Sequence, residues 1–124
     1  MASNPSWGSW VELHTGQSIT NGSSFTSDAI SGAGKIATEV GVVIDYGATA
    51  TEGCEAFPLA EIDDSGNYQT IADLPAGARM AYSTSTTYHV IISFDVMNSR
   101  KIGIRNNSGA TVTGHVYYRQ AVLA

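Results

Sequence analysis

The sequence predicts an all-β protein, an antiparallel β-sandwich or jelly roll of about eight to ten short strands. Apolar and polar residues alternate with a period of two in at least four segments, as they do in half-buried strands. Ser, Thr and Gly supply nearly a third of the 124 residues, and all three are poor formers of helix interiors. We find no long segment with the period of 3.6 that an amphipathic α-helix requires.

The first half of the chain contains one strong strand pattern, over residues 36–46. Val43 on the opposite face of this segment indicates partial cover there. The apolar face consists of Ile36, Val40, Val42, Ile44 and Tyr46. Weaker candidates are residues 10–15, 18–20, 25–27 and 56–62, and the Asn-Gly pair at residues 21–22 supplies the turn between the second and the third.

The alternation is strongest in the second half of the chain. In residues 88–96 the side chains on one face are apolar: Tyr88, Val90, Ile92, Phe94 and Val96. Ile102 and Ile104 alternate with other residues over 101–105, and a further strand follows the segment NNSGA (residues 106–110). Its apolar positions are Val112, Val116, Tyr118 and Val122. Residues 68–72 and 79–82 are weaker candidates.

Length and composition predict one β-sandwich domain over residues 9–124, preceded by a flexible arm of residues 1–8. Apolar residues make up 43% of the chain, an ordinary value for a packed domain. Charged residues make up only 14%, against roughly 25% in an average domain. The first residues lack the basic and apolar regions of a signal peptide, so we expect synthesis in the cytoplasm without secretion.

Charge, hydropathy and cysteine content argue against several classes of partner and ligand. The formal charge of −5 argues against a nucleic-acid binder, which needs clustered Lys and Arg. The longest apolar run is far shorter than the roughly 20 residues of a membrane-spanning helix. A lone Cys54 allows neither an internal disulfide nor a multi-cysteine metal site, and the adjacent Glu52 and Glu55 are expected to raise its pKa. We expect no cofactor and no metal.

The segment DDSGN (residues 63–67) looks most like a site of chemistry. Counted from Asp63, the glycine and the twelfth-position carboxylate of an EF-hand calcium loop are missing. Asp, Ser, Gly and Asn are the residues that accept turn dihedral angles, with Gly66 supplying a positive φ. The sequence therefore favours a tight turn, and leaves open a loop that contacts carbohydrate or calcium, or a pair of catalytic acids.

No enzyme motif is complete. GAGK (residues 32–35) lacks the first glycine of a phosphate-binding loop and the hydroxyl residue after its lysine. His14, His89 and His115 lie far apart in the sequence, and solvated histidines on strands are commoner than metal sites assembled from them. We therefore predict a protein that is not an enzyme.

Two tryptophans in the segment WGSW are candidate binding residues. Trp7 and Trp10 offer flat faces on which sugar rings stack. The favoured interpretation is that one caps an open end of the sandwich and the other docks on a neighbouring subunit, because tryptophan is also an anchor of protein interfaces.

Self-association is expected from the strand edges. An open sandwich leaves edges that lysines commonly protect, and this chain has only Lys35 and Lys101. Ile91 and Met97 fall on the nominally outer face of the strand over residues 88–96 and its extension. Apolar residues there predict a homo-oligomer, and we favour a homotrimer over a dimer.

A basic outer face is predicted if NNSGA joins the last two strands as a hairpin. Alternation then places on one face Lys101, Arg105, His115, Tyr117 and Arg119. Such a face is either a solvated surface or an electrostatic docking patch with Tyr117 as its aromatic anchor.

The segment KIGIRNNSGATVTGHVYYRQAVLA (residues 101–124) resembles the closing hairpin of β-sandwich virion proteins from tailed bacteriophages. These include head-decoration (cement) and tail-associated proteins. The resemblance covers about the last sixty residues and consists of an apolar alternating strand, a short basic strand, an Asn/Ser/Gly turn and an aromatic final strand. It implies a non-enzymatic structural protein of the virion, made in the bacterial cytoplasm, whose partner is a major capsid or tail protein lattice.

A second resemblance supplies an alternative. The turn DSGNY (residues 64–68), followed by such a hairpin, is similar to turns in galactose-binding-like sandwiches. This resemblance implies a carbohydrate-binding module that recognises a glycan with Trp7, Trp10 or exposed tyrosines.

Overall fold

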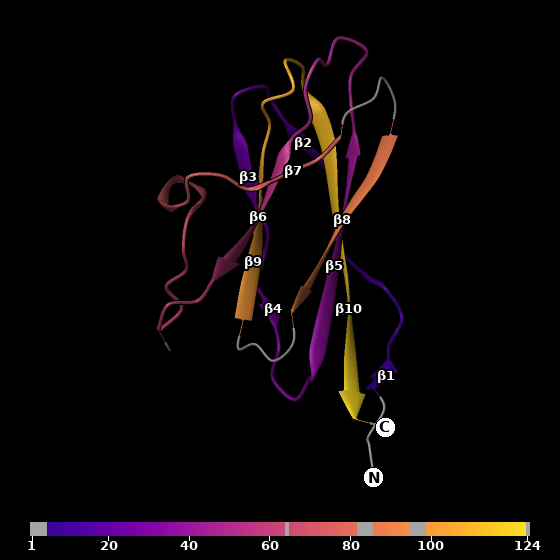
Figure 1. Cartoon of the computed structure of the whole chain (residues 1–124), viewed down its shortest axis with the longest axis vertical. Coiled ribbons are helices and arrows are strands. Elements are labelled where there is room, and N and C mark those ends of the chain that lie inside the picture. Colours follow the sequence, from indigo (N-terminus) through magenta and orange to yellow (C-terminus); the bar gives the residue numbers. More distant parts are fainter. Residues whose placement is uncertain (1–4, 64, 82–85, 95–98, 124) are drawn as a thin grey trace.

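The computed structural model describes residues 5–63, 65–81, 86–94 and 99–123. This part of the chain contains ten β-strands and one short 3-10 helix, η1 (Ile71–Asp73), but no α-helix. The strands form two antiparallel sheets that pack face to face, so the predicted all-β sandwich is confirmed (Figure 1). No helix in the described ranges is long and apolar enough to cross a membrane.

The first sheet is built around its central strand β10. β10 lies between β5 and an edge made of two consecutive strands, β1 and β2, while β8 forms the opposite edge of the sheet. The strands of this sheet are β1 (Pro5–Trp7), β2 (Val11–Ile19), β5 (Ala37–Asp45), β8 (Thr86–Phe94) and β10 (Val112–Leu123).

The second sheet repeats this arrangement around β9. β9 lies between β6 and an edge made of β3 and β4, while β7 forms the opposite edge. The strands of this sheet are β3 (Ser24–Thr26), β4 (Ile30–Ser31), β6 (Glu55–Ala60), β7 (Ala78–Arg79) and β9 (Ser99–Arg105).

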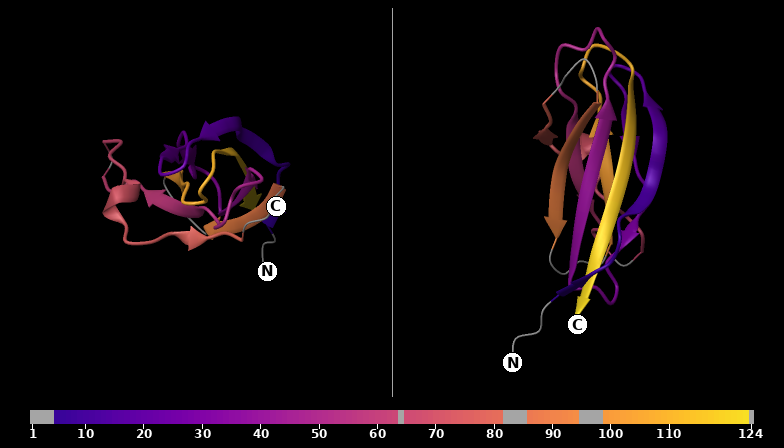
Figure 2. Two further views of the ribbon diagram at one scale, coloured as in Figure 1. Left: turned by 90° about the horizontal axis from the view of Figure 1, so that it is seen from above. Right: turned by 90° about the vertical axis from the view of Figure 1, so that its right-hand side faces the viewer.

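The connections make this sandwich a jelly roll. Each position in the first sheet, in the order β2, β10, β5 and β8, has a counterpart in the second sheet that is adjacent in the chain: β3, β9, β6 and β7. The chain therefore passes from one sheet to the other at most of its connections, and the two sheets enclose one core (Figure 2).

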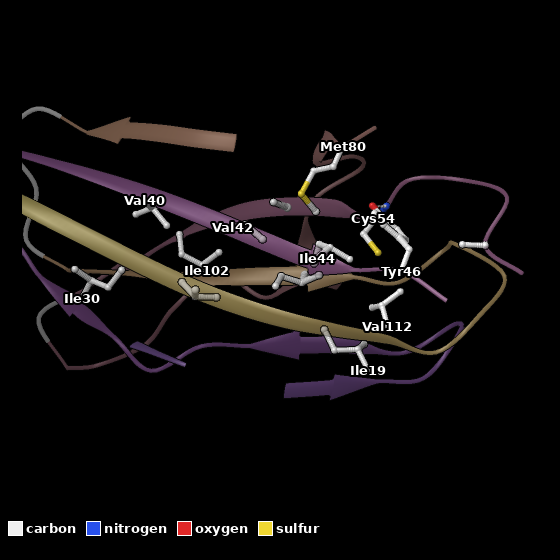
Figure 3. Packing of buried hydrophobic residues seen from close by; sticks show 14 residues of the cluster. Ile19, Ile30, Val40, Val42, Ile44, Tyr46, Cys54, Met80, Ile102 and Val112 are labelled. Carbon is white, nitrogen blue, oxygen red and sulfur yellow. Dashed lines mark hydrogen bonds between the residues drawn. The ribbon is translucent and has the colours of Figure 1, made fainter. Parts of the chain in front are cut away.

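β5 shows how the alternation in the sequence builds the core. Val40, Val42 and Ile44 are fully buried between the sheets, whereas Glu39 and Asp45 belong to the other face of the strand. Both sheets complete the core with further buried aliphatic residues, among them Ile19, Ile30, Ile102, Ile104, Val112 and Val116 (Figure 3). Removing this surface from water is the main favourable term in folding.

The last two strands do not form the predicted hairpin. β9 pairs with β3, β4 and β6 in the second sheet, whereas β10 pairs with β1, β2 and β5 in the first. The NNSGA segment between them crosses from one sheet to the other. Lys101 and Arg105 of β9 therefore lie on the opposite side of the sandwich from the outward residues of β10, and the predicted common basic face is wrong.

Asn106 explains why NNSGA is a crossover and not an exposed turn. Its side chain is fully buried: Nδ2 donates to the carbonyls of Ile19 at 2.8 Å and Ala110 at 2.7 Å, and Oδ1 accepts the N–H of Ser108 at 2.9 Å. Its main-chain N–H donates to the carbonyl of Ser23. These bonds join the β9–β10 loop to the β2–β3 loop at one end of the sandwich, the upper end in Figure 1.

The β5–β6 loop belongs to the same hydrogen-bonded group. The N–H of Thr51 donates to the carbonyl of Ser108 at 2.8 Å, and the Sγ of Cys54 lies 3.6 Å from Oδ1 of Asn106. The N–H of Cys54 donates to the hydroxyl of Tyr46 at 3.0 Å.

Burial raises the pKa of the Cys54 thiol, whereas the sequence analysis expected the neighbouring carboxylates to raise it. The same cause raises the pKa of Tyr46 to about 12.

Three segments differ from the sequence-based strand assignments. Pro5–Trp7, within the predicted flexible arm of residues 1–8, form β1 because they pair with the end of β10. In place of the predicted strand over residues 68–72, Tyr68 forms a single bridge with Glu61, and residues 71–72 belong to η1, where the Asp73 carboxylate accepts the N–H of Thr70. A register shift opposite Gly41 interrupts the pairing of β8 with β5, whereas the sequence predicted a regular strand over residues 88–96. Residues 95–96 lie outside the described ranges.

A second, smaller cluster covers the outer face of the second sheet. Phe57 and Leu59 of β6 point away from the main core and are buried together with Ile71 of η1. A Cβ on Gly103 of β9 would come within 2.6 Å of Ile71 Cγ1, so glycine permits the close approach of η1 to the sheet. The segment that carries η1 therefore closes this side of the sandwich.

The buried amide of Asn106 gives a stability prediction. Asn106→Ala removes the side-chain partners of the Ile19 carbonyl and the Ser108 N–H, and leaves the Ala110 carbonyl with the Ser108 hydroxyl as its donor. We therefore expect the free energy of unfolding to fall by about 3 kcal/mol. Urea titration followed by circular dichroism measures this loss. The matched control is Asn107→Ala, which removes one side-chain bond to Glu55 and is expected to cost about 1 kcal/mol. Equal losses in the two variants would contradict the central role of Asn106.

Candidate interaction face

The outer face of the first sheet carries a group of aromatic and charged side chains, here called the aromatic face. Alternation along β10 sends Tyr117 and Arg119 to this face, where their partners on β5 are Gly41 and Glu39. β1 and the residues just before β2 bring the tryptophans to the same place. The aromatic face consists of Trp7, Trp10, Glu39, Tyr117 and Arg119.

Arg119 holds the aromatic face together. Its Nε and Nη2 both donate to Oε1 of Glu39, at 3.1 and 2.8 Å. Its guanidinium carbon lies 4.9 Å from the ring centroid of Trp7 and 5.0 Å from that of Trp10. Each cation–π contact of this kind contributes about 0.5–1 kcal/mol at an exposed site. One guanidinium thus fixes two indole rings and one carboxylate.

Both indole rings remain accessible to a partner. Trp7 is 38% exposed and Trp10 is 43% exposed. The N–H of Gly8 donates to the carbonyl of Gln120 at 2.9 Å, which keeps the chain between the tryptophans against β10. The ring of Trp10 lies over Gly41, because a Cβ there would be 3.7 Å from Cζ3 of the ring. A side chain much larger than that of alanine would take the place of the indole.

Leu123 extends the aromatic face toward the end of β10. It is exposed, pairs with Pro5 of β1, and by alternation shares the face of Tyr117 and Arg119. Val122 and Val11 are also exposed but belong to the other face of their strands, since Val11 pairs with Tyr118. An exposed leucine beside two exposed tryptophans adds apolar surface to the aromatic face.

A polar cluster lies farther along the same face. Nε2 of His115 lies 2.9 Å from Oδ2 of Asp45, and the hydroxyl of Thr86 donates to the other oxygen of that carboxylate. Nδ1 of His115 accepts the N–H of Gly16 at 3.1 Å, and the hydroxyl of Thr15 lies 3.2 Å from it. The cluster connects β2, β10, β5 and β8 across the whole sheet. Hydrogen bonds from Thr86 and His115 lower the pKa of Asp45.

The structure brings together five of the residues predicted from the sequence. Trp7 and Trp10 join Arg119 through ring contacts, and the hydroxyl of Tyr117 lies 3.4 Å from Oε1 of Glu12 on β2. His115 shares the face of Tyr117 and Arg119 along β10. Met97 lies outside the described residues, and the side chain of Ile91 also lies outside the described part of the chain.

Lys101 and Arg105 lie on the outer face of the second sheet, where they contact aromatic rings. The Nζ of Lys101 lies 4.5 Å from the ring centroid of Tyr68. The guanidinium carbon of Arg105 lies 4.9 Å from the ring centroid of Phe57, and its Nη1 lies 3.7 Å from Oε1 of Glu55. Arg105 also donates to the carbonyl of Ile71 at 3.4 Å, so it fastens η1 to the sheet. Both basic residues stabilise the covering segment.

The DDSGN segment is a turn in its described part. Oδ1 of Asp63 accepts the N–H of Ser65 at 2.8 Å, Oδ2 accepts Nδ2 of Asn67 at 2.7 Å, and Gly66 has a φ of 81°. The bonds from Asn67 and Ser65 lower the pKa of Asp63. Asp64 lies outside the described residues. Within those residues, no group of three His, Cys, Asp or Glu side chains is placed to hold a metal ion.

Sequence reasoning missed Glu39 and Gly41 as members of the site. A lone glutamate in an alternating strand has the pattern of any solvated residue, and its pairing with Arg119 depends on which strands become neighbours. Gly41 could have been predicted as part of the site, because a glycine inside a strand pattern often marks the close approach of another group, here the ring of Trp10.

Comparisons with known proteins show similarity at the level of the fold. No protein-family model and no curated protein matches this chain. A protein of the T13 IBDV viral particle has a TM-score of 0.55 and 11% identity, over 98% of this chain and 32% of that one. A β-porphyranase of glycoside hydrolase family 86 from the human gut bacterium Bacteroides plebeius has a TM-score of 0.49 and 11% identity, over 98% of this chain and 21% of that one. This chain therefore spans at most about a third of either protein.

The contacts of Arg119 predict a fluorescence change. Arg119→Ala releases both indoles from the guanidinium, so we expect red-shifted tryptophan emission, faster quenching by acrylamide and a loss of about 1–2 kcal/mol in stability. The control is Arg79→Ala: among the described residues, the side chain of Arg79 forms an exposed ion pair with Glu52 and no other polar contact, so its loss should cost less than about 0.5 kcal/mol. Unchanged emission in the Arg119 variant would show that the tryptophans are held by other contacts.

The lowered pKa of Asp45 predicts how stability depends on pH. Because the pKa is lower in the folded state than in the unfolded state, the carboxylate stabilises the fold above its unfolded value of about 3.9. This contribution is lost as the pH falls through the folded value. We expect Asp45→Asn to be less stable than the parent at pH 7 by at most about 1 kcal/mol, since the carboxylate is partly exposed. Urea unfolding at a series of pH values should show this difference shrinking below about pH 4; a difference that persists into strong acid would contradict the assignment.

Proposed function

We propose that this chain is a non-enzymatic structural protein of a virion, a decoration (cement) protein of a tailed bacteriophage that docks on a capsid or tail lattice through its aromatic face. The observation that carries the proposal is the aromatic face itself. Trp7, Trp10, Tyr117 and Arg119 are of the three residue types that dominate the energetics of protein interfaces. Here they lie together on one sheet, partly accessible and already fixed in place.

Preorganisation favours docking by this face. Ordering a flexible side chain at an interface costs about 0.5–1.5 kcal/mol. The two indoles of the aromatic face are held by Arg119 before any partner arrives, so most of this cost falls on folding and not on association. A rigid aromatic surface of this kind suits a lattice that presents many copies of one flat epitope.

The jelly-roll topology and the composition agree with a virion location. Jelly rolls are a common architecture of capsid domains and also of lectins. The low content of charged residues fits a protein whose faces meet other proteins. Under this proposal the chain is made in the cytoplasm of the host and reaches the virion by assembly.

The polar cluster supports a non-enzymatic role despite its likeness to a catalytic triad. Thr15, His115 and Asp45 have the order of a nucleophile, a base and an orienting carboxylate. Nδ1 of His115, the atom that would take the proton, already accepts the main-chain N–H of Gly16. That bond occupies the lone pair of the base, and its role in joining β2 to β10 accounts for the cluster.

Glycan binding is the second candidate function, and one observation favours it. The ring of Trp10 rests on Gly41, nearly half of the residue is exposed, and the guanidinium of Arg119 over this ring also binds the Glu39 carboxylate. An accessible indole near a carboxylate offers a sugar ring a stacking surface and hydrogen-bond acceptors. The two functions use the same residues, so one set of variants tests both.

The test measures binding of variants to phage particles stripped of this protein. Trp7→Ala with Trp10→Ala should weaken particle binding by about a hundredfold, as the loss of two interface anchors does. Lys101→Ala, on the opposite side of the sandwich, should bind as the parent does. Melting curves confirm folding of each variant. Equal binding by the double variant and the parent would overturn docking through the aromatic face.

A glycan array with the purified protein separates the two functions. The docking proposal expects no glycan signal from the parent. A glycan signal that disappears in the double tryptophan variant, together with no affinity for particles, would establish the carbohydrate-binding function in its place.

A further inference from the structure

Within the residues that the structure describes, β8 leaves one border of the first sheet open. In the described part of the chain its main chain pairs with β5 alone, and it is the last strand on that side (Figure 2). A strand in this position presents a row of main-chain N–H and C=O groups to any strand that lies alongside. β8 has nine residues, TTYHVIISF, and is thus long enough for a stable pairing.

β8 differs from the other edges of the sandwich. β7 has two residues, β4 has two and β3 has three, so these edges offer little main chain. β2 has nine residues, but two register shifts distort it, and it carries Glu12. β8 has one register shift and contains none of the residues that usually protect an edge, because it lacks Lys, Arg, Asp, Glu, Pro and Gly.

We propose that β8 pairs antiparallel with β8 of a second copy of this chain, about a two-fold axis. The sequence of β8 favours this occupant, because a strand without formal charge meets no like charge in any antiparallel register against itself. The same strand is used on both sides, so the assembly closes as a dimer and leaves no further copy of this edge open. A two-fold dimer replaces the trimer that the sequence favoured.

The pairing has a geometric consequence for the aromatic face. Antiparallel addition continues the first sheet across the dimer, so the outer faces of the two first sheets point to the same side. Both aromatic faces can then contact the same partner surface, so the two tryptophan pairs bind it bivalently. The pairing itself does not rest on the proposed function, since it requires only the β8 edge.

Light scattering and hydrogen exchange test this pairing on the full chain. We expect a mass that rises from one copy to two with increasing concentration. We also expect main-chain exchange in peptides covering residues 86–94 to slow over the same range, while exchange in residues 11–19 at the opposite edge stays constant. A monomer at every concentration, a trimer, or a dimer without added protection in β8 would overturn the proposal.

Two matched substitutions locate the interface. Ser93→Lys places a charge on an exposed position of β8, and Ser18→Lys makes the same change at an exposed position of β2 on the other edge of the same sheet. Ser93→Lys should raise the dimer Kd about tenfold or more, while Ser18→Lys should leave it unchanged. Equal sensitivity to both substitutions would overturn pairing through β8. Because this assay contains no particles, its failure is separable from failure of lattice docking.

Discussion

The hydrogen bonds of the buried Asn106 side chain determine where the chain crosses from the second sheet to the first. A jelly roll needs its chain to cross repeatedly between two sheets, and each crossing carries main-chain groups away from the ladders that would pair them. Asn106 supplies partners for three of these groups, in residues 19, 108 and 110, and its own main chain bonds to the β2–β3 loop. Because a buried amide has both donors and acceptors, no aliphatic residue of equal size performs this task. The position of β10 in the first sheet, and hence the aromatic face, follows from this crossing.

The scarce positive charges of the chain are used mainly as partners for aromatic rings. Four of its six basic residues lie over a ring: Arg100, Lys101, Arg105 and Arg119. On the second sheet Lys101 lies over Tyr68, and Arg105 lies over Phe57 and donates to the carbonyl of Ile71, so these two residues hold the segment that contains η1. On the first sheet Arg119 holds two indoles whose outer surfaces stay accessible. Contacts between basic side chains and aromatic rings therefore occur on both sides of the sandwich. On the second sheet they hold the η1 segment over the sheet, and on the first sheet they fix the proposed docking surface.

Local patterns predicted the fold class well, and long-range pairing limited the prediction of the site. Period-two alternation located β5 and β10 because each of these strands buries one face. Gly66 indicated a turn, and its positive φ and the hydrogen bonds of Asp63 to Ser65 and Asn67 confirm that turn. The same alternation does not say which strands are neighbours. NNSGA has the composition of a hairpin turn, and only the burial of Asn106 makes it a crossover, so Lys101 and Arg105 were assigned to the wrong side. The tryptophans were recognised by type, whereas their contacts with Arg119 depend on the pairing of β1 with β10.

Electron cryomicroscopy of particles that carry this protein shows which face of the sandwich meets the lattice. We expect density in which the outer face of the first sheet, with Trp7 and Trp10, contacts the lattice and the η1 segment faces solvent. We also expect neighbouring copies, where they touch, to meet along β8. A map in which the tryptophans face solvent and the second sheet contacts the lattice would rule out docking through the aromatic face.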